Sequence, residues 1–153
     1  MIKTIKGDLL ELFRAGKFDA IAHGCNCFHT MGAGIALQIA RQFPEAEDAD
    51  LKTARGAVKF GMISVAEIPD MGYIINMYTQ VNPGRQTQED LIRGITSCFE
   101  QLGSRFPTAT SPAFKLGIPR IGAGIAGGDW DTHLAIIESA TSMFDVTVVE
   151  LPE

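Results

Sequence analysis

Short apolar runs alternate along this chain with longer stretches in which apolar residues recur every three or four positions. A short apolar run bounded by turn residues is typical of a β-strand, whereas the longer spacing is typical of a helix that buries one face. Strands are therefore expected at residues 2–5, 20–23, 62–67, 73–78, 114–118 and 146–151. Helices are expected at residues 9–15, 34–43 and 45–54, between Thr87 and Gly103, and from Asp129 onward.

Turn and capping residues mark several element ends. The link at residues 68–72 is short and contains proline and glycine, so the third and fourth strands are expected to form a hairpin. Pro44 suits the first position of a helix. Thr87, with an acidic residue three positions on, has the pattern of an N-cap, and Gly103 is expected to end that helix. Residues 106–112 then form a linker.

Strands that alternate with helices, together with one hairpin, predict a mixed α/β sheet covered by helices on both faces. The 153 residues fit one domain, residues 1–153, with a full core. In such sheets ligands bind at the carboxyl ends of strands, where loops lead into helices. Two turns rich in glycine and alanine stand at such places, at residues 31–34 and 122–128.

These two turns are the strongest functional signal in the chain. Small side chains let a ligand approach the backbone closely, and free N–H groups at the start of a helix attract anions. Two such turns predict two phosphates, and hence a diphosphate ligand. The alternative is tight packing between strand and helix. Residues 122–127 also fit G-x-G-x-x-G, but no acidic residue ends a strand about twenty positions later, so a Rossmann dehydrogenase is rejected.

Charge restricts the class of partner. The net charge is −5 and lysines and arginines form no cluster, which argues against duplex nucleic acid as a partner. An anionic ligand would be held by backbone N–H groups and helix dipoles. No apolar run is long enough to cross a membrane. The three cysteines are an odd number and the N-terminus reads as a strand rather than a signal peptide, so we expect a cytoplasmic protein.

His23, Cys25, Cys27 and His29 alternate along an extended segment. Metal coordination by all four is rejected, because alternate residues of an extended chain would spread over roughly 20 Å and could not converge on one ion. No metal and no cofactor are therefore expected. Cys25 and Cys27 are interpreted as small buried hydrophobic residues. His29 and, further along, His133 are expected at the surface.

Three polar residues end or follow predicted strands. His23 is a candidate general acid–base, because the pKa of a histidine ordinarily lies near neutrality; the alternative is a hydrogen-bonded structural histidine. Asn26 either shapes a turn or bridges a sugar hydroxyl. The spacing of Asp8 alone indicates a turn former or a helix cap.

Three segments, in order, resemble a macrodomain, the ADP-ribose-binding α/β module. They are residues 5–9 (IKGDL), residues 21–27 with 31–36 (IAHGCNC and MGAGIA), and residues 118–130 (IPRIGAGIAGGDW). The second and third segments most resemble the branch of ADP-ribose 1''-phosphate phosphatases and terminal ADP-ribose glycohydrolases. The resemblance covers nearly the whole chain and implies a three-layer α/β/α macrodomain with a mixed central sheet.

The resemblance also implies a role for each matching residue. Asp8 would accept a hydrogen bond from the adenine amino group, beside the Leu9 backbone, and Asn26 would bind the distal ribose. Residues 32–34 would line the distal ribose and the diphosphate, and residues 122–127 would wrap the diphosphate. The expected ADP-ribose-binding residues are Asp8, Leu9, Asn26, Gly32, Ala33, Gly34, Ile35, Gly122, Ala123, Gly124, Ile125, Ala126 and Gly127.

Two positions depart from that branch. Its glycohydrolases use a lysine near the end of the hairpin strand and an aspartate in the second glycine loop, where this chain has Gln80 and Ala126. Neither residue can form a lysine adduct or serve as its acid–base partner. Alanine at position 126 leaves room for a substituent on the 1'' carbon. Arg85, in the loop that borders the distal ribose, either reaches a terminal phosphate or is exposed to solvent.

The expected function is binding of ADP-ribose or a 1''-modified derivative, with metal-independent hydrolysis of ADP-ribose 1''-phosphate by a positioned water. His23 would be the general acid–base, and Asn26 would orient the sugar and the water. Two alternatives stay open. One is a non-catalytic reader of ADP-ribose, on proteins or as a metabolite, and the other is a hydrolase of ADP-ribosylated protein or O-acetyl-ADP-ribose.

Overall fold

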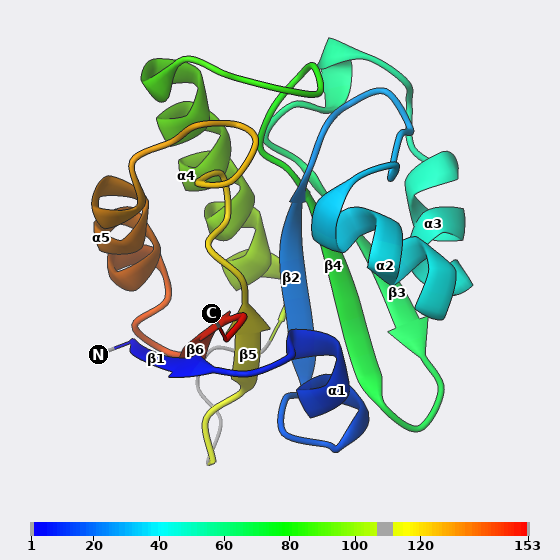
Figure 1. Cartoon of the computed structure of the whole chain (residues 1–153), viewed down its shortest axis with the longest axis vertical. Helices are drawn as coiled ribbons and strands as arrows, with labels where there is room; N and C mark the ends of the chain where they lie inside the picture. The colour runs from blue at the N-terminus through cyan, green and yellow to red at the C-terminus, as the bar shows by residue number, and fades with distance from the viewer. Residues whose placement is uncertain (1, 107–111, 153) are drawn as a thin grey trace.

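The computed structural model describes residues 2–106 and 112–152, so most of the expected linker lies outside the described residues. Its centre is a six-stranded sheet in the order β1–β6–β5–β2–β4–β3 (Figure 1). Neighbouring strands run parallel except for β3 and β4, which form the expected hairpin. The strands are β1 Lys3–Lys6, β2 Ala20–Cys25, β3 Ile63–Ile68, β4 Gly72–Tyr78, β5 Lys115–Ile118 and β6 Asp145–Glu150.

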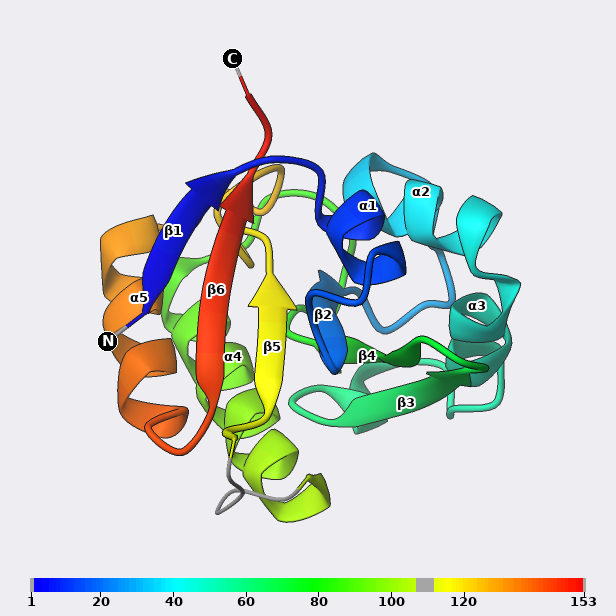
Figure 2. The ribbon, with the colours of Figure 1, turned by 90° about the horizontal axis from the view of Figure 1, so that it is seen from below.

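Helices cover both faces of the sheet, which confirms the three-layer α/β/α arrangement (Figure 2). Helices α1, α2 and α3 lie on one face, while α4 and α5 pack against each other on the other face. The helices are α1 Leu9–Arg14, α2 Gly34–Gln42, α3 Pro44–Leu51, α4 Gln88–Arg105 and α5 Trp130–Ala140, with a short 3-10 helix η1 at Ala57–Lys59.

Each face of the sheet has its own hydrophobic core. Alternation along β2 shows the division, because Ile21 packs with the α1–α3 layer while Ala20 and Ala22 pack with the α4–α5 layer. In the latter layer the helices contribute fully buried residues such as Ile95 and Ile137. A fully buried aliphatic side chain stabilises a fold by roughly 1.5–3 kcal/mol. Two such layers hold the sheet as a firm support for the loops at its ends.

Most predicted element ends lie within one or two residues of the observed ends, and two predicted capping positions are confirmed. Pro44 is the first residue of α3, and the Thr87 hydroxyl caps α4 by accepting a backbone hydrogen bond of 3.2 Å. The prediction that Gly103 ends α4 is wrong, since the helix continues to Arg105. Leu102 before the glycine is fully buried and Phe106 after it packs against the same core, so packing on both sides carries the helix past Gly103.

The parallel strands all end at one edge of the sheet, and this positions the site. The loops that leave β1, β2, β4 and β5 meet there and lead into α1, α2, α4 and α5. Both glycine-rich turns lie in these loops: residues 31–34 follow β2, and residues 122–128 follow β5. The fold therefore brings the two turns together, as the general rule for ligand sites in such sheets predicts.

Candidate functional site

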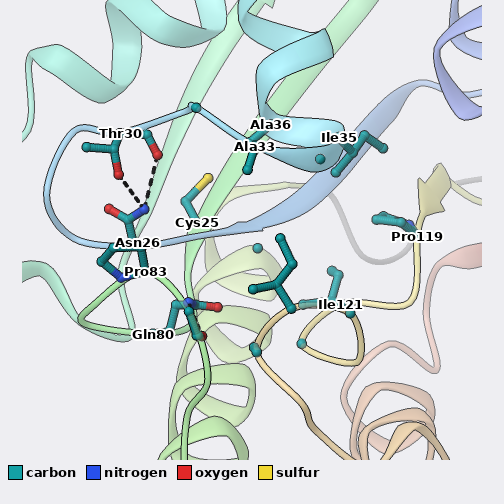
Figure 3. Close-up of a pocket in the computed structure, with 18 of the residues that line it drawn as sticks. Cys25, Asn26, Thr30, Ala33, Ile35, Ala36, Gln80, Pro83, Pro119 and Ile121 are labelled. Carbon is teal, nitrogen blue, oxygen red and sulfur yellow. Dashed lines mark hydrogen bonds between the residues drawn. The ribbon is translucent and has the colours of Figure 1, made fainter.

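Two cavities lie side by side at this edge and form one groove. The first has a volume of about 430 Å³ and the second about 450 Å³, within the usual range for small-molecule sites. Both turns and the loops after β2 and β4 line the first cavity (Figure 3). Residues that follow β1 and β6 line the second. The cavities share Gly34, Ile35, Pro119 and Arg120.

One wall of the first cavity is the start of α2. Ala33, at the N-cap, has no side chain that could accept from the first N–H groups of the helix, and no side chain in the described part of the chain caps them. The N–H groups of Gly34, Ile35 and Ala36 are therefore free to bind a ligand at the positive end of the helix dipole. All three residues line the cavity.

The facing wall is the turn at residues 121–128. The Gly128 N–H donates to the Gly122 carbonyl at 2.8 Å, which closes the turn on itself. Within residues 2–106 and 112–152, the N–H groups of Gly122 and of residues 124–126 have no acceptor. A second set of free backbone N–H groups thus belongs to residues that line the same cavity.

Two of the expected binding residues line neither cavity. The Ala123 N–H donates to the Arg120 carbonyl at 3.1 Å, and the Gly127 N–H donates to the Gly124 carbonyl at 3.0 Å. These two residues therefore shape the turn from within. The other expected residues line the first or the second cavity: Asp8, Leu9, Asn26, Gly32, Ala33, Gly34, Ile35, Gly122, Gly124, Ile125 and Ala126.

Main-chain groups dominate the electrostatics of the first cavity. Among the described residues that line it, Arg120 alone has a charged side chain, and its guanidinium is paired with Glu150. An anion between the two walls would meet backbone N–H groups first. These groups are fixed by the fold, so they bind an anion without reorganisation.

Asn26 shapes the loop that follows β2. Its Oδ1 accepts from the Phe28 N–H at 2.9 Å, and its Nδ2 donates to both oxygens of Thr30, at 3.0 and 2.7 Å (Figure 3). Both amide hydrogens are thus used within the loop. Asn26 lines the first cavity, where the second lone pair of Oδ1 is available to a ligand.

Asp8 begins α1 and lines the second cavity together with Leu9. Its Oδ1 accepts from the N–H groups of Leu10 at 2.9 Å and Glu11 at 3.1 Å, which confirms the predicted helix cap. Asp8 Oδ2 has no partner in the described part of the chain. One carboxylate oxygen can therefore accept a hydrogen bond from a ligand in the second cavity.

His23 lies in the core rather than in a cavity wall. It is fully buried, its Nε2 is 2.7 Å from Asn76 Oδ1, and it lines neither cavity. Burial outweighs the hydrogen bond to Asn76 and the charge of Asp50, and it lowers the pKa of His23 to about 4. A neutral, enclosed imidazole is out of reach of a bound substrate. The geometry thus supports the structural interpretation of His23 over the catalytic one.

Cys25, His23 and Asn76 have the composition of a cysteine nucleophile site but not its geometry. Cys25 lines the first cavity, and its Sγ is 3.7 Å from His23 Nδ1 and 3.6 Å from Nε2. A sulfur nearly equidistant from both ring nitrogens is aligned with the lone pair of neither. Burial raises the pKa of Cys25 well above its usual range, so the thiol stays protonated. Cys25 and Cys27 are both buried, as predicted.

A chain of buried polar side chains, here named the α3 network, fills the space between the sheet and α3. Asn76 Nδ2 donates to Ser64 Oγ at 3.1 Å, and Ser64 Oγ lies 2.8 Å from the Tyr78 hydroxyl. That hydroxyl donates to Asp50 Oδ1 at 2.8 Å, and Lys59 Nζ forms an ion pair with the same oxygen at 3.1 Å. Every side chain in the network is almost fully buried.

The sequence interpretation missed the α3 network. Polar residues within otherwise apolar strands could have indicated it: Ser64 lies in β3, and Asn76 and Tyr78 occupy alternate positions in β4. At Tyr78, where β4 ends, the network packs with Cys27 in the loop after β2. The loops after β2 and β4 are also joined directly, by a 2.9 Å bond from the Cys27 N–H to the Val81 carbonyl.

Gln80 and Ala126 both line the first cavity. The Gln80 side chain is turned toward its own loop, where Nε2 donates to the Asn82 carbonyl at 2.8 Å. The Ala126 carbonyl accepts from the Gln86 N–H at 2.9 Å, which ties the loop after β4 to the turn at residues 121–128. Neither position offers an acid, a base or a nucleophile. Arg85 is exposed and lines neither cavity.

The two histidines expected at the surface are both at least partly enclosed. His29 is half-buried. His133 is fully buried, so its surface prediction is wrong: it shares one face of α5 with buried Ile137, and Thr141, the C-cap of the helix, is buried on the same side. His133 Nδ1 is 3.0 Å from the Ile121 carbonyl oxygen, which places the imidazole directly behind the turn at residues 121–128.

Among residues 2–106 and 112–152, no group of three His, Cys, Asp or Glu residues is arranged to hold a metal ion. No helix found there has both the length and the apolar character needed to cross a bilayer. Cys25, Cys27 and Cys98 are free and buried.

Known proteins with similar sequences or folds cover almost the whole chain. A family model described as Macro domain matches residues 22–137. The chain is 38% identical to the "Uncharacterized 17.5 kDa protein in tk-vs intergenic region" of Enterobacteria phage T4, over 98% of this chain and 96% of that protein. It is 25% identical to the ADP-ribose 1''-phosphate phosphatase of Lodderomyces elongisporus, over 97% and 99%. The solved macrodomain of Thermus aquaticus DarG has the same fold, with a TM-score of 0.74, 24% identity and 98% coverage of both chains.

Proposed function

The chain belongs to the Macro domain family, and on that basis we propose that it binds ADP-ribose along the groove and hydrolyses the phosphate of ADP-ribose 1''-phosphate. One observation carries the proposal: two sets of free backbone N–H groups, from α2 and from the turn at residues 121–128, line one cavity. The relative named ADP-ribose 1''-phosphate phosphatase, which matches almost the whole chain, supports the reaction.

In the proposed complex the adenine lies in the second cavity. Asp8 Oδ2 accepts from the adenine amino group, beside Leu9. The diphosphate lies between the start of α2 and the turn at residues 121–128, where hydrogen bonds from N–H groups to a charged group contribute about 1.5–3 kcal/mol each. The distal ribose lies in the first cavity with Asn26, and the small side chain of Ala126 leaves room for its 1'' substituent.

Hydrolysis depends on a positioned water and on the substrate's own phosphate. A phosphate monoester has a second pKa near 6, so its oxygens can take up the proton of the attacking water near neutral pH. The water oxygen bonds to phosphorus, the bond between phosphorus and the 1'' oxygen breaks, and the proton ends on the departing oxygen. The chain holds the phosphate oxygens with N–H groups and orients sugar and water with Asn26. His23 has no step in this scheme.

A second function, non-catalytic recognition of ADP-ribose, is favoured by the composition of the first cavity. Among the described residues that line it there is no carboxylate, histidine or lysine that could act as an acid or base. A hydrolase of ADP-ribosylated protein or of O-acetyl-ADP-ribose would bind the same nucleotide and differ in the leaving group. These functions are separated by their products.

The test is to incubate the protein with ADP-ribose 1''-phosphate, O-acetyl-ADP-ribose and ADP-ribosylated protein, and to measure released phosphate, acetate and ADP-ribose. Phosphate release alone is expected. Tight binding of ADP-ribose, measured by calorimetry, without turnover of any substrate would instead support non-catalytic recognition of ADP-ribose. Release of acetate would indicate a hydrolase of O-acetyl-ADP-ribose, and release of ADP-ribose would indicate a hydrolase of ADP-ribosylated protein; either result would contradict the phosphatase.

A matched pair of variants ties the result to the groove. A Cβ at Gly124 meets open space in the first cavity, and a Cβ at Gly103 meets open space on α4, far along the chain from the site. Gly124→Leu is expected to abolish ADP-ribose binding because the side chain fills the place of the ligand. Gly103→Leu is expected to bind as the wild type does. Undiminished binding by Gly124→Leu would place the ligand elsewhere.

A further inference from the structure

His133 stands behind the turn at residues 121–128 and lines neither cavity. Its Nδ1 is 3.0 Å from the Ile121 carbonyl oxygen. A carbonyl only accepts, so Nδ1 carries the hydrogen of this bond. Its Nε2 is buried and has no partner in the described part of the chain. An unpaired buried nitrogen lowers stability, and an apolar side chain would avoid that loss. The histidine is therefore a candidate for a functional rather than a stabilising role.

The bond to Nδ1 fixes the direction of one peptide group. The C=O and N–H of a trans peptide point in opposite directions. Because the Ile121 carbonyl is turned back toward His133, the Gly122 N–H points away from the imidazole. Gly122 lines the first cavity, and its N–H has no acceptor among the described residues. Gly122 also has a φ of 77°, a left-handed conformation that glycine adopts without the steric cost of a Cβ.

The imidazole also accounts for two glycines of the turn. A Cβ at Gly128 would collide with His133 Cε1 and with the Gly122 carbonyl oxygen, and a Cβ at Gly122 would lie 3.0 Å from His133 Cε1. A Cβ at Gly124 would meet no atom. Gly122 and Gly128 thus make room for the histidine, whereas Gly124 keeps the cavity open.

We propose that His133 is a positioning residue for the diphosphate, which it serves by holding the Ile121–Gly122 peptide with its N–H directed at a bound phosphate. The inference rests on the proposed binding of ADP-ribose. Without the imidazole donor, the buried Ile121 carbonyl has no partner, and it gains one by turning toward water in the cavity. An attractive N–H is then replaced by a carbonyl that repels the anion.

The test compares two substitutions and two ligands. His133→Leu removes the donor and fills most of the space, whereas His133→Asn keeps a donor, because the Asn Nδ2 occupies nearly the position of the His Nδ1. Dissociation constants are measured by calorimetry for ADP-ribose and for adenosine, which lacks the diphosphate. His133→Leu is expected to weaken ADP-ribose binding about tenfold or more and to leave adenosine binding unchanged. His133→Asn is expected to bind both ligands within about threefold of the wild type.

Two results overturn the role of His133 while ADP-ribose still binds the wild type. One is equal ADP-ribose affinity in His133→Leu and the wild type. The other is a parallel loss of adenosine and ADP-ribose affinity, which indicates general loosening. If the wild type binds no ADP-ribose, the proposed function fails first and the inference falls with it. Should His133→Leu not fold, His133→Gln replaces it, because its amide reaches the Nε2 position rather than the Nδ1 position.

Discussion

The two walls of the first cavity present the same kind of group to a ligand but rest on different supports. The α2 wall is the start of α2 with the loops after β2 and β4. Cys27 of the loop after β2 packs on Tyr78 of the α3 network, which includes the Asp50–Lys59 ion pair. The turn wall, residues 121–128, is held by its own backbone bonds, by one backbone bond from Gln86 to the Ala126 carbonyl and by the imidazole of His133.

Because the supports differ, substitutions in them are expected to affect different quantities. In the α2 wall each side chain of the network is hydrogen-bonded to another member, so loss of one member leaves a buried polar group unpaired and destabilises the fold. In the turn wall, loss of one side chain re-aims one peptide. Substitutions in the α3 network should therefore lower the free energy of unfolding, whereas loss of the His133 side chain behind the turn should lower the affinity for the ligand.

Lys59→Met removes one partner of the buried ion pair in the α2 wall. Asp50 is then left charged and buried with the Tyr78 hydroxyl as its remaining side-chain partner in the described part of the chain. The expected loss is about 3–5 kcal/mol of unfolding free energy, measured by urea denaturation. The matched control is Lys6→Met, which removes an exposed partner of Glu150 and should change stability little. If Lys59→Met and Lys6→Met lose similarly small amounts of unfolding free energy, the α3 network does not support the wall as assigned.

His23 makes the same support sensitive to acid. Burial lowers its pKa from 6.5 to about 4 in the folded chain. Between these values the unfolded chain binds more protons, so stability falls as the pH falls from about 6.5 to about 4, and it has no such dependence above neutrality. The slope approaches about 1.4 kcal/mol per pH unit, and the loss reaches about 3 kcal/mol near pH 4.

The measurement is urea denaturation of the wild type and of His23→Gln across this pH range. Other groups titrate there too, so the informative quantity is the difference in slope between the two proteins. Identical slopes would show that His23 does not titrate as its burial requires. His23→Gln should also keep phosphate release, since the imidazole lines neither cavity. Loss of turnover with unchanged ADP-ribose affinity would restore a catalytic role to His23.

Asp8→Asn extends the comparison to the adenine end of the groove. Asparagine caps a helix about as well as aspartate, so the melting temperature should stay near that of the wild type. The carboxylate oxygen proposed to accept from adenine is replaced, and ADP-ribose affinity should fall about tenfold or more by calorimetry. Equal ADP-ribose affinity in Asp8→Asn and the wild type would contradict the adenine assignment. If Asp8→Asn weakens binding of ribose 5-phosphate, which lacks adenine, as much as binding of ADP-ribose, the substitution has changed the groove more widely.

The sequence predicted the fold because each layer of this molecule has its own periodic apolar face. It predicted the caps at Asp8 and Thr87 because capping is local and involves only the next few residues. It did not predict the position of His133, because the periodicity of a helix indicates which face is buried but not which loop that face contacts. For the same reason Gly124, which borders the cavity, and Gly128, which makes room for an imidazole, looked alike.

Thr79→Val gives the smallest effect and the sharpest contrast between the walls. Each wall has one buried polar atom without a partner in the described part of the chain: Thr79 Oγ1 at the end of β4 and His133 Nε2 behind the turn. Valine has the shape of threonine and removes the unpaired hydroxyl, so Thr79→Val should raise the unfolding free energy by about 1 kcal/mol. ADP-ribose affinity should not change, because Thr79 orients no group toward the ligand. If Thr79→Val weakens ADP-ribose binding as much as His133→Leu, the α2 wall also orients groups for the ligand, and the division between a stabilising wall and a positioning wall is lost.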